Sequence, residues 1–74
     1  MNKQRRKSIS EIIRNIESIK LSLENVLSDE QDYFDNMPEN LQGSIRGEES
    51  EEAIDILEEA VDGLDDIINS LQDI

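Results

Sequence analysis

Apolar residues recur through the first half of the chain at alternating intervals of three and four residues. The series, in which one glutamate is the only polar member, is Ile9, Ile12, Ile16, Ile19, Leu23, Val26, Glu30, Tyr33 and Met37. Such spacing is the heptad repeat of an α-helix with one packed side. Ser8 and Glu11 form a capping box just before the series, and Pro38 disfavours helix in the residue that precedes it. We therefore expect a first helix over residues of about 8–37.

A second series with the same intervals fills the C-terminal part of the chain. Its members are Ala53, Leu57, Ala60, Leu64, Ile67, Leu71 and Ile74. Acidic residues crowd the start of this segment, where the helix dipole favours negative charge, and either Gly47 or Ser50 is a suitable N-cap. We expect a second helix over about 48–74. Two helices of similar length with a short connection form an antiparallel hairpin, so the predicted fold class is all-α.

Each series is accompanied by a second apolar row, one residue further along the chain. Three apolar positions per heptad make a face wider than a two-helix contact needs, and this width is typical of a helix bundle. We expect a homodimer or a larger homo-oligomer, most simply two hairpins that form a four-helix bundle. The residues predicted to form the oligomer interface are Ile13, Leu27, Ile54, Val61 and Ile68.

The connection between the two helices is chemically distinct from the rest of the chain. The stretch "YFDNMPENLQGSIRG", residues 33–47, holds both aromatic residues, the only proline and the only basic residue after position 20. We predict a built corner over residues 38–47, in which two aliphatic side chains pack on the two aromatic rings. Arg46 is placed to reach the last carbonyl groups of the first helix or a nearby acid. The residues assigned to this corner are Tyr33, Phe34, Pro38, Leu41, Ile45 and Arg46.

Charge is divided very unevenly along the chain. Residues 1–20 sum to +4 and residues 21–74 to −16, for a net charge of −12. We expect a basic N-terminal tail over residues 1–7, followed by the hairpin over 8–74, because positive charge is unfavourable at a helix N-terminus. Residues 48–74 contain no lysine or arginine. A row of carboxylates on the second helix is the predicted partner-binding face: Glu48, Glu52, Asp55, Glu59, Asp62 and Asp66.

Composition argues against several classes of protein. The chain has no cysteine and no histidine, and it has no glycine-rich phosphate loop. The usual nucleophile–base pairs and zinc ligands are therefore missing, and we expect neither an enzyme nor a metal or other cofactor. No apolar run approaches the roughly 18 residues of a membrane span, and charges interrupt the N-terminal segment where a signal peptide would need an apolar core. We expect a soluble intracellular protein.

The corner and the second helix resemble a known group of proteins. "YFDNMPENLQGSIRGE", followed by "EEAIDILEEAVDGLDDIINSL", is similar to small acidic helical-hairpin proteins of bacteriophages and prophages. The shared pattern is an aromatic residue, "DNMPENLQ", then "S" and "RGE" with one variable residue before each, and an acidic helix. The resemblance covers about residues 29–74. It implies an α-hairpin of phage type in the cytoplasm of a bacterial host, or alternatively in the phage particle, and it brings no established activity.

Two functional classes fit these features. The first is a protein-binding hairpin, either an adaptor or assembly module that docks through its apolar rows or an acidic inhibitor of a basic host protein. The alternative is a DNA-mimic anti-defence protein, of an anti-restriction or anti-CRISPR-like kind, that uses the acidic face of the second helix. In both, the expected partner is a basic protein rather than nucleic acid or a membrane, because the acidic surface repels phosphates and attracts cations.

Overall fold

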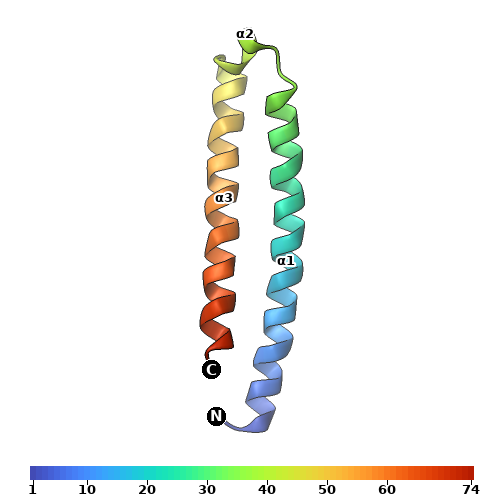
Figure 1. Cartoon of the computed structure of the whole chain (residues 1–74), viewed down its shortest axis with the longest axis vertical. Coiled ribbons are helices and arrows are strands. Elements are labelled where there is room, and N and C mark those ends of the chain that lie inside the picture. The colour runs from blue at the N-terminus through green and yellow to red at the C-terminus, as the bar shows by residue number, and fades with distance from the viewer.

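The computed structural model describes all residues, 1–74, as two long antiparallel helices that lie side by side (Figure 1). Helix α1 spans Lys3–Asp35, the single-turn α2 spans Glu39–Gln42, and α3 spans Ile45–Gln72. Figure 1 shows α2 at one end of the molecule and both termini at the other. The chain measures 58 × 15 × 13 Å along its principal axes. The predicted all-α helical hairpin is confirmed, and no helix is long and apolar enough to cross a membrane.

Helix α1 begins earlier than its capping box suggested. The side chain of Asn2 accepts a hydrogen bond from the Arg5 backbone N–H at 2.8 Å and so caps the helix. Ser8 lies inside α1, where its hydroxyl donates to the Gln4 carbonyl at 3.1 Å. The basic residues 3–7 therefore form the first turns of α1 rather than a tail before it. These turns extend beyond the end of α3 (Figure 1).

The corner is closed by side-chain hydrogen bonds to the backbone. Pro38 stops α1 and, with φ −57° and ψ 145°, sits at the N-cap of α2. The side-chain amide of Gln42 then reaches back and donates to the carbonyls of Phe34 and Met37, both at 3.2 Å. The Phe34 carbonyl lies in the last turn of α1, where backbone acceptors lack partners within the helix, and the Met37 carbonyl lies just after its end. Gln42 thus satisfies them and fixes the angle at which the chain turns.

Helix α3 starts from Ser44, whose hydroxyl accepts a hydrogen bond from the Gly47 N–H at 3.5 Å. The N-cap is therefore Ser44 rather than Gly47 or Ser50. Gly47 has a different task, because a Cβ at this position would lie 1.9 Å from the Gln42 carbonyl oxygen. Only glycine allows α2 to lie this close to the first turn of α3.

The two long helices face each other through one pair of apolar rows, which we call the inner rows. They consist of the more buried positions of each helix: Ile9, Ile13, Ile16, Lys20, Leu23, Leu27, Glu30 and Phe34 in α1, and Gly47, Ser50, Ile54, Leu57, Val61, Leu64, Ile68 and Leu71 in α3. The spacings still alternate between three and four residues. Helix periodicity was thus predicted correctly, but every second member of each expected series lies one residue away from the observed contact.

The inner row of α3 buries larger side chains than the expected series would have done. In α3 the expected series offers Ala53 and Ala60, whereas the inner row offers Ile54 and Val61 at the neighbouring positions. Since the free energy of burial follows the apolar area removed from water, the row with the larger side chains is preferred. This choice brings Lys20 into the contact.

The resulting core is thin. Only three of the 74 residues are buried, and Ile68, at 6 % exposure, is the only hydrophobic residue among them. The buried Ser50 donates a hydrogen bond to the Glu30 carboxylate at 2.9 Å, which satisfies a polar pair near the corner. The remaining inner-row side chains are half-buried, because a single neighbouring helix covers only one side of each.

Candidate functional site

The strongest candidate site is the acidic face of α3, the row of six carboxylates predicted from sequence. All six side chains are exposed, and they follow one another at intervals of four and three residues along the helix: Glu48, Glu52, Asp55, Glu59, Asp62 and Asp66. They occupy the side of α3 opposite to its inner row. Carboxylates three or four residues apart lie about 5–6 Å from one another at Cβ. The row is therefore a continuous line of negative charge that runs most of the length of α3.

No cation of the chain neutralises this face. The two salt bridges of the molecule both belong to Lys20, whose Nζ lies 2.5 Å from Asp65 and 3.7 Å from Glu24. Neither acid belongs to the acidic face. Acidic residues on an isolated surface helix are commonly interleaved with lysines for pairing across one turn. Here their mutual repulsion is left in place, which makes the potential outside α3 strongly negative.

Lys20 shows the contrasting case of a charge held inside the contact between the helices. The hydrogen bond from its ammonium group to Asp65 raises the pKa of Lys20 above the ordinary 10.5, and desolvation lowers it by a smaller amount. The charges of Asp65 and Glu24 raise it further. Lys20 is therefore a permanent cation near neutral pH. It joins α1 to α3 and occupies a position where the heptad pattern would place an apolar residue.

The corner residues are arranged differently from the expectation. Phe34 is half-buried in the inner row, but Tyr33 and Leu41 are exposed, and Ile45 is 76 % exposed. The predicted packing of the two aliphatic residues on both rings is therefore not what the structure contains. The closed end is held instead by the amide of Gln42, which donates to the backbone carbonyls of Phe34 and Met37.

Arg46 forms no salt bridge and no side-chain hydrogen bond, so the contacts expected for it are absent. Gln42 takes the carbonyl-capping role that we had assigned to Arg46. One signal in the sequence was available: Gln42, whose amide can donate two hydrogen bonds, lies four residues after the proline that ends the first helix. Arg46 remains exposed on the first turn of α3, beside the acidic face.

The residues predicted to form the oligomer interface lie inside the hairpin. Ile13, Leu27, Ile54, Val61 and Ile68 all belong to the inner rows, and Ile68 is the most buried hydrophobic residue of the chain. Their contacts are those between α1 and α3, and Ile13, Leu27, Ile54 and Val61 are only half-buried by them. Many of the apolar residues left exposed belong instead to the series expected to join the two helices: Ile12, Ile19, Val26, Tyr33, Ile67 and Ile74.

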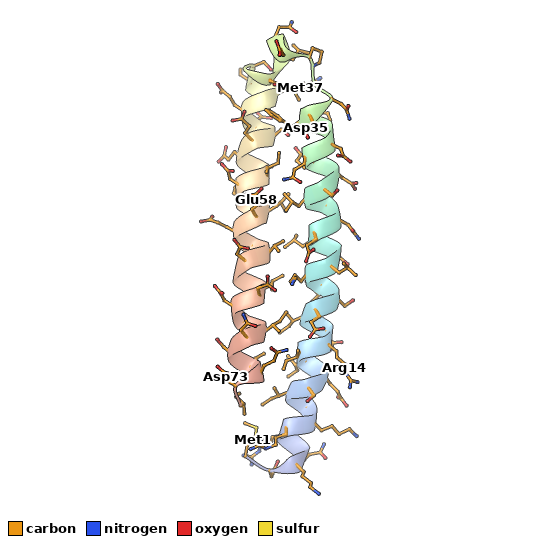
Figure 2. The ribbon with its side chains drawn as sticks, viewed as in Figure 1. Met1, Arg14, Asp35, Met37, Glu58 and Asp73 are labelled. Carbon is orange, nitrogen blue, oxygen red and sulfur yellow. The ribbon has the colours of Figure 1, made fainter.

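The basic turns at the start of α1 are not neutralised by the acids of α3. Arg6 donates to two carbonyl oxygens, those of Ile74 at 3.1 Å and Met1 at 3.3 Å. The remaining cations of these turns, Lys3, Arg5 and Lys7, are exposed and form no salt bridge. Figure 2 shows side chains of α1 and α3 meeting between the helices, while Arg14 and Asp73 project away from the contact.

The geometry offers charge and apolar surface. No three acidic side chains are grouped in a way that could hold a metal ion. Comparison with protein-family models, curated proteins and solved structures found no match. Fold and surface together define an acidic helical hairpin.

Proposed function

We propose that this protein is a non-enzymatic, protein-binding hairpin whose acidic face engages a basic partner protein. The observation that carries the proposal is the row of six exposed carboxylates on α3, none of which is paired with a cation of the chain. Single exposed carboxylates contribute little to binding. A row of them produces a field that attracts and orients a cationic partner before contact.

The charge density along α3 supports DNA mimicry as the second candidate. Residues 48–66 hold ten carboxylates, and at a rise of 1.5 Å per residue they lie on about 27 Å of helix axis, roughly 2.7 Å per charge. One strand of B-DNA carries one phosphate per about 3.4 Å of axis. A cleft that is built to bind a nucleic-acid strand would therefore meet a similar linear charge on α3. This candidate differs from the first only in the kind of basic surface that is occupied.

The resemblance to phage and prophage hairpins supports a setting for this function. In that setting the protein acts in the cytoplasm of a bacterial host, and the partner is a host protein. An adaptor role in assembly requires a different surface, because the inner rows are occupied within the hairpin. It would have to use the exposed apolar residues of α1 and α3.

Capture from a bacterial lysate tests the acidic face when a matched control is included. The immobilised parent should retain a basic protein at low salt and release it as salt rises, since screening weakens exposed charges. The variant Asp55→Asn/Glu59→Gln/Asp62→Asn should retain much less of it. The control Glu11→Gln/Asp32→Asn/Asp35→Asn removes three exposed carboxylates from α1 instead, with the same change in net charge, and should bind like the parent.

Competition with duplex DNA separates the two candidates. If the captured protein itself binds DNA and free duplex displaces it from α3, the acidic face acts as a DNA mimic. If the protein is basic but duplex DNA does not displace it, the acidic face acts on another basic surface. If the α3 and α1 triple variants retain equal amounts of the captured protein, the acidic face is not its binding surface.

A further inference from the structure

One face of the hairpin carries large apolar side chains that nothing in the chain covers. We call it the apolar face, and it is defined by Ile12, Ile19, Val26 and Tyr33 of α1 together with Ile56 and Ile67 of α3; all six are about half exposed or more. In α1 the four residues recur every seventh position. Because the heptad period keeps such residues on one side of a helix, they form a continuous stripe along α1.

The stripes on the two helices lie on the same face of the hairpin. An open groove around Lys20 shows which face is the other one, because it is lined by Arg14, Leu21 and Glu24 of α1 and by Asp65, Asn69 and Gln72 of α3. Relative to the inner rows, these residues lie on the side opposite to Ile12 and Ile19 in α1, and opposite to Ile56 and Ile67 in α3. The polar groove and the apolar face are therefore the two broad sides of the molecule.

The apolar face follows a large part of the hairpin. In α1 its stripe runs from Ile12 to Tyr33, which is about 32 Å of helix axis at a rise of 1.5 Å per residue. Ile56 and Ile67 of α3 widen it, and all six side chains are about half exposed or more. Single exposed apolar residues need no explanation, but a stripe that is continuous over several turns is typical of an interaction surface.

Small residues in the middle of the α3 stripe allow a close approach of a second helix. Ala60 and Gly63 lie between Ile56 and Ile67 on this side of α3, and a Cβ built at Gly63 meets nothing within 4 Å. Glycine inside a helix is unfavourable relative to alanine, and no contact within the chain explains it here. The two small residues between two large ones would allow a helix of another molecule to pack closely against this side of α3.

The distribution of charge indicates which molecule can cover the apolar face and in which orientation. The Lys20–Asp65 contact divides the hairpin into two parts. Residues 1–20 and 65–74 hold six cations and five carboxylates, a net +1, whereas residues 21–64 hold fourteen carboxylates and one arginine, a net −13. Two copies stacked with their corners together would place −13 on −13. With the corners at opposite ends, the basic turns at residues 3–7 of one copy lie beside the acidic part of the other, residues 21–64.

We propose that a second copy of this chain covers the apolar face, with the two corners at opposite ends, to form a four-helix bundle. The two copies are related by a two-fold axis, so each contributes the same surface. The acidic face and the polar groove stay outside the bundle on both copies. The proposal does not depend on the proposed function, since it uses the other broad side of α3.

Sedimentation equilibrium of three forms tests which face is covered. At micromolar concentration the parent should sediment at twice the chain mass of 8.5 kDa. Ile19→Glu should sediment at the chain mass with the helix content of a hairpin. Leu21→Glu is the matched control: Leu21 is 61 % exposed and Ile19 is 59 %, but Leu21 faces the polar groove. The control should remain a dimer. A monomeric parent, or equal behaviour of the two variants, would overturn the proposal.

A distance measurement between labels tests the direction. Asn40 lies exposed in α2 at the corner, and the chain has no cysteine of its own. A spin label on Asn40→Cys should give a distance within the dimer that approaches the 58 Å length of the molecule. A short distance would place the corners together and overturn the arrangement, even if the mass is that of a dimer. When Ile19→Glu is added, the protein should be monomeric, and no distance between two spin labels should be detected.

Discussion

The acidic face and the apolar face of α3 are built from the same helix, yet they differ in nearly every physical respect. The acidic face gains its strength from charges that no cation of the chain neutralises, and it should weaken in salt. The apolar face gains its strength from area removed from water, which salt does not weaken. One helix can thus serve two partners, because side chains on different sides of it respond to different forces.

Both faces depend on the inner rows, so the largest effect should come from Ile68. Replacing Ile68, which is 6 % exposed, with alanine leaves a cavity between the helices and should lower the free energy of unfolding by about 3 kcal/mol. Thermal unfolding followed by circular dichroism measures the loss. Ile45→Ala is the control, because this side chain is largely exposed, and its effect should stay within about 0.5 kcal/mol. Equal losses would mean that the inner rows are assigned incorrectly.

Phe34 and Tyr33 are adjacent aromatic residues that lie on different surfaces. Phe34 is half-buried in the inner row, so Phe34→Ala should lower the free energy of unfolding by about 2 kcal/mol, less than for a fully buried ring. Tyr33 is exposed on the apolar face. Tyr33→Ala should therefore act through the dimer, with a loss that shrinks as the protein is diluted. A loss for Tyr33→Ala that is independent of concentration would contradict the proposed covering of that face.

Gly47 and Gly63 both lie in α3, but they should respond oppositely to replacement by alanine. A Cβ at Gly47 would overlap the Gln42 carbonyl, so Gly47→Ala should separate α2 from α3 and cost about 2 kcal/mol of unfolding free energy. Gly63→Ala meets no atom of its own chain and should raise the stability of the isolated helix by up to about 1 kcal/mol. Denaturant titrations measure both changes. If Gly63→Ala raises the helix stability but weakens the association of two copies, the result supports close approach of the second copy at this glycine.

Lys20 should give the smallest change in stability, because its ion pair reaches solvent. Lys20→Met replaces a charge in the inner row with an apolar side chain of similar length, and it should leave the melting temperature near neutral pH unchanged or slightly higher. The pKa of Lys20 is raised by Asp65, so any stability from this group is complete below pH 10.5 and is lost as pH rises through the raised pKa. The parent should therefore lose more stability than the variant above pH 10.5. Parallel losses would show that the pair contributes nothing.

Much of this architecture follows from the sequence, and the exceptions have physical reasons. Two heptad series, separated by a proline, predicted the hairpin. The choice between adjacent rows was not predicted, because Ile12 and Ile13 fit a heptad pattern equally well and only the total area buried decides between them. The helix start was missed because Asn2 is as good a cap as Ser8. The acidic face was placed correctly as an exposed row, since a helix that buries one side must expose the opposite side.

The corner was the hardest part to predict. Its aliphatic residues suggested a small apolar cluster, but the amide of Gln42 closes the turn and leaves Ile45 in water. Sequence patterns reveal apolar periods more readily than a single amide that caps a distant carbonyl. The residues predicted to form the oligomer interface lie in the inner rows, because these rows are displaced by one residue at every second position from the expected series.

The most direct test of the account is the association rate of the captured partner with three forms of the hairpin at low salt. The variant Asp55→Asn/Glu59→Gln/Asp62→Asn should associate about tenfold more slowly than the parent, with a flatter dependence on salt. Its dissociation rate should change less, and its mass should remain that of a dimer. The control Glu11→Gln/Asp32→Asn/Asp35→Asn should associate at the parent's rate. If the first variant associates as fast as the parent, the acidic face is not the binding surface, and the account is contradicted.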